Sequence, residues 1–243
     1  MSFDDKKSRS LTPVFERPAV AFFGRSLAEY VQFFDLDVDA LRGRSVLDVA
    51  AGPSSFTAEA RRGGVEAVAV DPLYARNPAD LERQVAQDYE HMFERMRTGQ
   101  NSGRFRFKSF ASVDEAEADR RRAAKRFLGD FAAHREHGRY FGAALPKLPF
   151  LDGAFDVVLC AHLLFIYPAL FDFAFHLAAC RELMRVARDE VRIHPVCGAD
   201  GQPYPQLGDL IGELGESGVE AREVPVDYEF FAGATTMLVL RPG

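Results

Sequence analysis

The sequence predicts an α/β fold: a mostly parallel, seven-stranded sheet with helices on both faces and an antiparallel hairpin at one edge. Short apolar runs alternate with segments of helical periodicity, which is typical of a parallel sheet covered on both sides. The first two runs enclose a helix, and the unit of about 30 residues has the size of a right-handed crossover. Between residues 74 and 138 the pattern becomes helical, charged and aromatic, which indicates an insertion.

The segments around the first crossover have the clearest patterns. A helical segment is predicted at about 19–43, because Leu27, Tyr30, Val31 and Phe34 follow helical spacing. The elements predicted after it are a strand at 45–50, a turn of small residues at 51–55, a helix at 56–62 and a strand at 66–70, closed by Asp71-Pro72.

The insertion at about 75–138 is predicted to form a helical cap over the ligand cleft, because an ordinary crossover needs only about a dozen residues. Its loop is expected at 99–103, and residues 1–18 are expected to be loosely structured. The chain is predicted to form one domain over 1–243. The remaining elements are strands at 139–144, 155–160, 190–194, 220–226 and 235–240, and helices at 172–188 and 205–217.

Composition narrows the class of protein. The formal charge of −6 and the pI near 5.6 provide no general attraction to a phosphate backbone, which argues against nucleic acid as a partner. Cys160, Cys180 and Cys197 are widely spaced, so a reducing cytoplasm fits better than a disulfide framework. The sequence shows no signal peptide and no apolar stretch long enough for a membrane span, so we expect a soluble, cytoplasmic protein.

The turn after Asp48 is the first candidate site. Ala50, Ala51 and Gly52 are small, so a ligand can approach the backbone at the carboxyl end of the first strand. Asp71 follows about 20 residues later, a spacing that suits a carboxylate accepting both hydroxyls of a ribose. Alternatively, Asp71 only forms the turn at the strand end. The pattern favours an adenosine-containing cofactor.

The same turn argues against a dinucleotide. The three glycines of G-x-G-x-x-G would stand at Ala50, Gly52 and Ser55, and two of them are replaced. Asp48 would repel a pyrophosphate but attracts an ammonium group, directly or through water. In the alternative, Asp48 braces the turn through backbone amides. S-adenosylmethionine, which has an ammonium group and a ribose but no phosphate, fits better than NAD.

Three segments together resemble the class I S-adenosylmethionine-dependent methyltransferases, which have a Rossmann-like fold. Residues 46–52 (VLDVAAG) resemble the first motif of that family, residues 68–71 (VAVD) the second, and residues 148–159 (LPFLDGAFDVVL) the segment before the fourth strand. The likeness is greatest to the subgroup acting on quinone precursors and other small molecules. It covers about 44–74 and 139–241, and implies methyl transfer to a nucleophilic O, N, S or C atom of a small molecule.

The chain departs from the family pattern at several positions. Ala50 and Ser54 stand where the family has glycine, and Ala143 or Ala144 where it often has an acid near the adenine. The resemblance then implies that backbone groups, Leu145 and Phe150 hold the adenine.

The resemblance also nominates residues around the methionine portion and the methyl group. His162 follows the fourth strand, where it could remove a proton from the acceptor, and its backbone or that of Ala161 could contact the cofactor. Arg25 could pair with the methionine carboxylate, and Tyr30 could close over the cofactor. In the alternatives, His162 only packs, Arg25 is an exposed helix-start residue and Tyr30 belongs to the core. Pro72 and Tyr167 are further candidates, the latter as a weaker base.

Other charged patterns have structural interpretations. His134 and His137 are spaced for metal binding, but no further ligands follow, so no metal is expected. The basic run 120–126 alternates with acids and indicates a salt-bridged helix surface. Asp152 and Asp156 are read as turn-forming residues.

Three other functions remain open at this stage. An NAD-dependent oxidoreductase could use the same sheet, and a non-catalytic module could retain the cofactor site. An RNA methyltransferase could use the basic and aromatic stretch 104–108.

Overall fold

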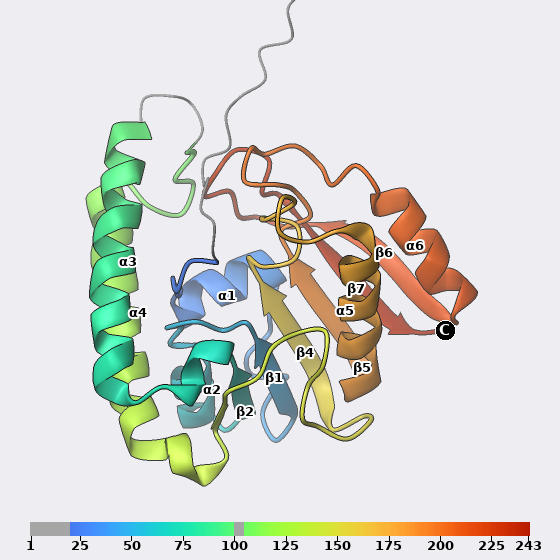
Figure 1. Ribbon diagram of the computed structural model, residues 1–243, viewed down its shortest axis with the longest axis horizontal. Coiled ribbons are helices and arrows are strands. Elements are labelled where there is room, and N and C mark those ends of the chain that lie inside the picture. Colours follow the sequence, from blue (N-terminus) through green and yellow to red (C-terminus); the bar gives the residue numbers. More distant parts are fainter. Residues whose placement is uncertain (1–19, 100–104) are drawn as a thin grey trace, which may run out of the picture.

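The computed structural model describes residues 20–99 and 105–243 (Figure 1). The loop predicted at 99–103 and the segment 1–18 therefore lie almost entirely outside the described residues. The helices are α1 (Leu27–Phe34), α2 (Phe56–Arg62), α3 (Pro78–Gly99), α4 (Val113–His134), α5 (Phe173–Val186) and α6 (Leu207–Glu216), with short 3₁₀ turns η1 (Pro72–Ala75) and η3 (Arg135–His137). The strands are β1 (Ser45–Val49), β2 (Glu66–Val70), β3 (Tyr140–Phe141), β4 (Phe155–Ala161), β5 (Ala187–His194), β6 (Val219–Pro225) and β7 (Thr236–Pro242).

The seven strands form one sheet in the order β3-β2-β1-β4-β5-β7-β6. Strands β1 to β5 are parallel, whereas β7 pairs antiparallel with both β5 and β6. The predicted fold class and the antiparallel edge pair are confirmed. Strand order reverses at β1, since β2 lies on one side of it and β4 on the other, and ligands bind at such a reversal.

Alternating side chains along the strands build two cores. Val46, Ala67, Ala69 and Leu159 pack in one cluster with α1, α2, α3 and α4. Their neighbours along the strands, such as Leu47, Val49 and Val158, pack in a second cluster with α5 and α6. The alternation follows from the two-residue period of a strand, and it buries both faces of the sheet.

The insertion consists of α3 and α4, which pack against each other and extend the α1–α2 layer (Figure 1). Tyr74 shows how they join the core, since its ring stacks on Phe127 of α4 with centroids 5.4 Å apart. The pair therefore lies beside the sheet, and only parts of it reach the carboxyl ends of the strands.

Two predicted elements are shorter than expected. The strand expected at 139–144 is limited to Tyr140–Phe141, because Gly142 leaves the sheet. Gly142 packs closely on Ala75, and a Cβ at Gly142 would lie 2.8 Å from the backbone nitrogen of Ala75. The helical segment expected at 19–43 forms a helix only at Leu27–Phe34, and residues 20–26 have no regular secondary structure.

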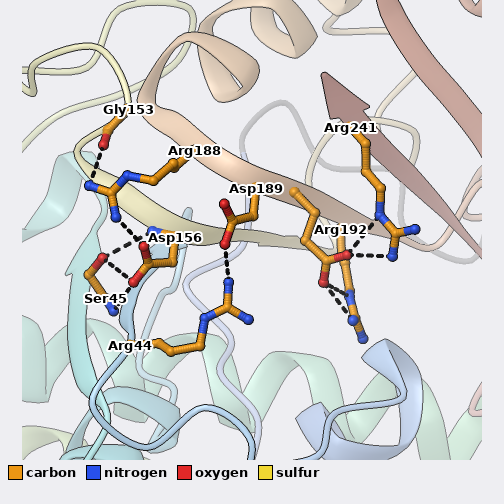
Figure 2. Close-up of polar contacts among 9 residues, drawn as sticks. Arg44, Ser45, Gly153, Asp156, Arg188, Asp189, Arg192 and Arg241 are labelled. Carbon is orange, nitrogen blue, oxygen red and sulfur yellow. Dashed lines mark hydrogen bonds and ion pairs between the residues drawn. The ribbon is translucent and has the colours of Figure 1, made fainter. Parts of the chain in front are cut away.

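Polar side chains tie the amino ends of the strands together, at the edge opposite the strand carboxyl ends (Figure 2). Asp156 accepts hydrogen bonds from the backbone nitrogen and hydroxyl of Ser45 at 2.8 and 2.9 Å and pairs with Arg188. Burial acts to raise the pKa of Asp156, but these bonds and charges outweigh it and the pKa lies below its ordinary value. The structural interpretation of Asp156 agrees with this position.

Candidate functional site: a cleft at the carboxyl ends of β1, β2 and β4

The turn between β1 and α2 has two consecutive bends in the left-handed region. Ala50 has φ +55° and Gly52 has φ +55°, so the chain reverses within a few residues after β1. The hydroxyl of Tyr74 donates to the carbonyl of Gly52 at 2.5 Å, which ties the turn to η1. Glycine accepts such a φ without strain, whereas alanine does not.

We expect Ala50→Gly to stabilise the protein by about 1 kcal/mol, because the left-handed conformation costs a non-glycine residue roughly that much. The free energy of unfolding in urea measures the effect. Ala51→Gly is the matched control: Ala51 is buried and has no positive φ, so the change should destabilise. Equal losses in both variants would contradict the strain at Ala50.

Asp71 connects the two strand ends that form the cleft. Its carboxylate accepts from the backbone nitrogens of Gly52 at 3.1 Å and Leu73 at 2.9 Å. Burial raises the pKa of Asp71 to about 6, although both hydrogen bonds act to lower it. A ligand that donates further hydrogen bonds would favour the ionised carboxylate.

A cavity of about 250 Å³ lies beside Asp71 at the carboxyl ends of β1 and β2. Its lining is almost entirely apolar, and Asp71 is the one ionisable side chain among its described lining residues. The predicted residues Ala50, Pro72 and Leu145 line this cavity, together with Leu73, Leu163, Phe171 and Phe175. A flat apolar group attached to a hydroxyl-bearing group matches this chemistry.

Asp48 lies behind the cleft. It is fully buried, and the hydroxyl of Tyr30 donates to its two oxygens at 3.0 and 3.1 Å. Burial raises the pKa of Asp48 well above its ordinary value, and the nearby Asp71 adds to the rise. Tyr30 lines the cleft and Asp48 does not, so Asp48 makes no direct contact with the cleft.

Residues of the irregular segment 20–26 line both cavities of the cleft. Gly24 packs so closely on the β1–α2 turn that a Cβ would lie 2.2 Å from the carbonyl carbon of Pro53. The segment is bound to the insertion, since Phe22 N donates to Asp88 at 2.9 Å and Gly24 N donates to the Tyr89 hydroxyl at 3.2 Å. The insertion therefore shapes the site by fixing this segment.

A smaller cavity of about 40 Å³ continues under segment 20–26. Its lining includes five further predicted residues: Arg25, Ala51, Gly52, Ala161 and His162. The predicted cofactor residues thus line one of these two adjoining cavities, except Asp48 and Phe150. The ring of Phe150 packs on Phe141 and Phe155 instead.

His162 lies where this cavity meets a third one. Its backbone has φ +54°, and both ring nitrogens are buried without a hydrogen-bond partner among the described residues. Burial lowers the pKa of His162 well below its ordinary value, and the positive charge of Arg25 lowers it further. Both effects disfavour the protonated form, so the imidazole is neutral at physiological pH.

Sequence reasoning missed His194, whose ring lies 5.1 Å from the ring of His162. His194 is the register partner of Ala161 in the β4–β5 pair and is fully buried. Burial lowers its pKa to about 3, so it too is neutral. The sequence contains a signal for this pair. The predicted fourth strand ends shortly before His162, and the predicted fifth strand ends at His194.

Sequence reasoning also placed Arg120 wrongly. The basic run forms a salt-bridged surface at Arg121 and Arg122, as predicted, but Arg120 is completely buried. It donates to Glu29 through Nε at 3.0 Å and Nη2 at 2.6 Å. The aliphatic and aromatic residues that bury it come from distant segments, so helical periodicity alone does not reveal it.

The remaining candidates have other surroundings. His134 lies near Asp130, and no group of three metal-ligating side chains occurs in residues 20–99 and 105–243. In the stretch 104–108, Arg104 lies outside the described residues, while Arg106 and Lys108 face Glu229 and Asp227. The Tyr167 hydroxyl accepts from Ala21 N at 3.2 Å.

Among the helices that the structure describes, none combines the length and apolar character of a membrane span.

The strand order and the surrounding helices define a Rossmann-like α/β protein with a cleft at the switch point of the sheet. The chain belongs to the same family as the uncharacterized protein MJ0045 of Methanocaldococcus jannaschii. The two are 33% identical over 218 residues, covering 90% of this chain and 94% of that protein. No family model matches the chain.

Solved structures with a similar fold include S-adenosylmethionine-dependent methyltransferases. Magnesium protoporphyrin IX methyltransferase from Synechocystis PCC 6803, solved with bound S-adenosylmethionine, is 13% identical, with 84% of this chain and 72% of that chain covered and a TM-score of 0.44. A methyltransferase from Aquifex aeolicus is 15% identical, with 88% and 93% covered and a TM-score of 0.44. These likenesses concern the fold.

Proposed function

We propose that the protein binds S-adenosylmethionine in the cleft and transfers its methyl group to a small-molecule acceptor. The observation that carries the proposal is the buried Asp71 carboxylate at the tip of β2, beside an apolar cavity of about 250 Å³. Asp71 accepts the ribose hydroxyls, and the apolar wall holds the adenine. When bound, the cofactor supplies a methyl group activated by its sulfonium.

The residues of the smaller cavity suit the methionine portion. The Tyr30 hydroxyl donates its hydrogen to Asp48, so its oxygen is left to accept from an ammonium group of the methionine portion. Ala50 carries a Cβ where a pyrophosphate-binding turn has its first glycine, so NAD is the weaker fit. Neutral His162 accepts the proton that the attacking hydroxyl, amine or thiol loses.

Calorimetry with three ligands tests the proposal. S-adenosylmethionine and S-adenosylhomocysteine should bind and NAD should not; binding of NAD alone would support an oxidoreductase instead. A screen of phenols, acids, amines and thiols with labelled cofactor then measures transfer. Binding without any labelled product would favour the non-catalytic module, and salt-dependent binding of RNA would favour the nucleic-acid acceptor.

The pKa of Asp71 predicts how the affinity for S-adenosylmethionine depends on pH. Only the ionised carboxylate accepts both ribose hydroxyls, so affinity rises as the pH passes about 6 and levels off above it. With one proton involved, the dissociation constant should be about tenfold larger at pH 5 than at pH 7. Tyr74, which faces Asp71, stays protonated in this range because burial raises its pKa. The same titration with Asp71→Asn should be flat, and an equal slope would assign the proton to another group.

For His162 we expect a separation of turnover from binding. Asparagine tolerates the left-handed φ of +54° at this position, so His162→Asn preserves the backbone. Loss of the base should lower kcat about 100-fold, while the dissociation constant of the cofactor changes little. His134→Asn, at the end of α4, is the control. Unchanged kcat in His162→Asn would assign His162 a packing role.

A further inference from the structure

A third cavity, of about 40 Å³, also has His162 in its lining. It shares Ala21, Phe23, Arg25 and His162 with the cavity proposed to hold the methionine portion, so it adjoins the position of the methyl group. Its other wall is formed mainly by apolar side chains of α3 and the β6–β7 connection: Met92, Met96, Phe230 and Phe231, with Ile166. We call it the acceptor cavity.

Two guanidinium groups, those of Arg25 and Arg120, line this cavity beside His162 and Tyr167. Arg120 is completely buried, and its Nη1 has no hydrogen-bond acceptor among residues 20–99 and 105–243. Nε of Arg25 is likewise buried without a hydrogen-bond acceptor among the described residues. Nη1 of Arg25 donates to the carbonyl of Phe23 at 3.2 Å. Unpaired donors of a buried cation are costly, so each marks a place for a negatively charged partner.

The surrounding charges do not balance. Within residues 20–99 and 105–243, Glu29 is the one carboxylate that pairs with Arg120, and none pairs with Arg25. The Tyr228 hydroxyl donates at 2.6 Å to the Glu29 oxygen that also accepts from Nη2 of Arg120. The histidines His162 and His194 are neutral at physiological pH. Two positive charges and one negative charge leave the cavity with an excess positive charge.

Aromatic rings hold both cations in place. The guanidinium carbon of Arg120 lies 3.8 Å from the ring centroid of Phe230 and 5.2 Å from that of Phe23. The guanidinium of Arg25 lies 5.9 Å from the centroid of the same Phe23 ring. Because rings and the Glu29 pair fix these side chains, the free donors are preorganised for a ligand.

We propose that the acceptor cavity is a carboxylate subsite, so that the methyl acceptor is an organic acid with an apolar body. The inference rests on the proposed function and names its class of substrate. A water molecule needs about 10–15 Å³ of such volume, so a cavity of about 40 Å³ accommodates a group of the size of a carboxylate. The excess positive charge disfavours an acceptor that carries an ammonium group.

Matched acid and amide pairs test this subsite without any turnover. The probes are benzoate, phenylacetate and 2-naphthoate, each with its amide, titrated by NMR into the full chain saturated with S-adenosylhomocysteine. At least one acid should bind about tenfold or more tightly than its amide, since one charge-assisted interaction gives that difference. Equal binding of acids and amides, or binding of neither, would overturn the inference.

Variants assign the binding to the two cations. Arg25→Gln leaves no carboxylate unpaired and should reduce acid binding about tenfold while amide binding is unchanged. Arg120→Lys keeps a positive charge opposite Glu29 but removes the free Nη1, and it serves as a second variant should Arg25→Gln fold poorly. Arg121→Gln, the neighbouring residue on α4, is the control because Arg121 is half exposed and pairs with Glu117. Equal loss of acid binding in the control would also overturn the inference.

Two outcomes separate this inference from the proposed function. If the acids bind only in the absence of S-adenosylhomocysteine, the cations serve the cofactor's own carboxylate; the subsite is then excluded and the cofactor is retained. If S-adenosylhomocysteine itself does not bind, the proposed function fails. The acid and amide pairs titrated into the ligand-free chain then decide the carboxylate subsite independently.

Discussion

The Asp71→Ala variant is expected to bind S-adenosylmethionine about 100-fold more weakly than the parent protein. Each hydrogen bond from a ribose hydroxyl to the buried carboxylate contributes roughly 1.5 kcal/mol, and two are lost, so about 3 kcal/mol of binding free energy disappears. Asp71 also accepts from Gly52 and Leu73, so the β1–α2 turn loses support as well. Calorimetric titration of both proteins measures the change in affinity.

A control must separate this loss from a general effect of removing a carboxylate near the sheet. Asp156→Ala does so, because Asp156 accepts two hydrogen bonds from Ser45 at the opposite end of the strands (Figure 2). It should lower the free energy of unfolding without altering cofactor affinity. If Asp71→Ala retains full affinity while folded, the ribose does not bind at the tip of β2.

The Glu29→Gln variant is expected to lower the free energy of unfolding by about 3–5 kcal/mol. Removing one partner of a buried ion pair leaves the other charge buried and uncompensated. Glu29 and Arg120 are 2% and 0% exposed, and Arg120 donates to both Glu29 oxygens. Burial acts to raise the pKa of Glu29, but Arg120 outweighs it and the pKa lies below its ordinary value. Urea unfolding monitored by circular dichroism measures the loss.

The double variant Glu29→Gln/Arg120→Met should recover most of the lost stability, because it removes both charges from the core. A double-mutant cycle then yields the coupling energy of the pair. The exposed pair Arg121–Glu117 is the matched control on the same helix, and Glu117→Gln should cost less than about 1 kcal/mol. A small loss in Glu29→Gln would mean that water reaches the Arg120 guanidinium.

The elements of the first crossover could be predicted closely from the sequence. The structure places α2 at Phe56–Arg62 and β2 at Glu66–Val70, the predicted bounds of both. These elements depend on local signals: apolar strands buried on both faces, a Gly-Gly helix end and an Asp-Pro turn. The β1–α2 turn and Asp71 follow from the same segment, so the cofactor side of the site could be proposed from the sequence.

The acceptor side could not be predicted in this way. Arg120, Glu29 and His194 come from α4, α1 and the end of β5, and they meet only because the sheet order brings these elements together. The basic run predicted that Arg120 lies on a solvated helix surface. Helical periodicity does not reveal that α3, segment 20–26 and the β6–β7 connection enclose this side chain. Likewise, the last strand, β7, inserts between β5 and β6, which the hairpin pattern alone does not specify.

The sequence by itself thus determined the α/β class, the parallel crossover and the acidic turn at the carboxyl ends of β1 and β2, because these depend on residues near one another in the chain. Tertiary structure decided the rest. It placed Asp48 behind Tyr30, set segment 20–26 along the cleft and enclosed Arg25 and Arg120 beside His162. Burial and charge in that cavity arise from packing between distant segments, which no local sequence pattern reveals.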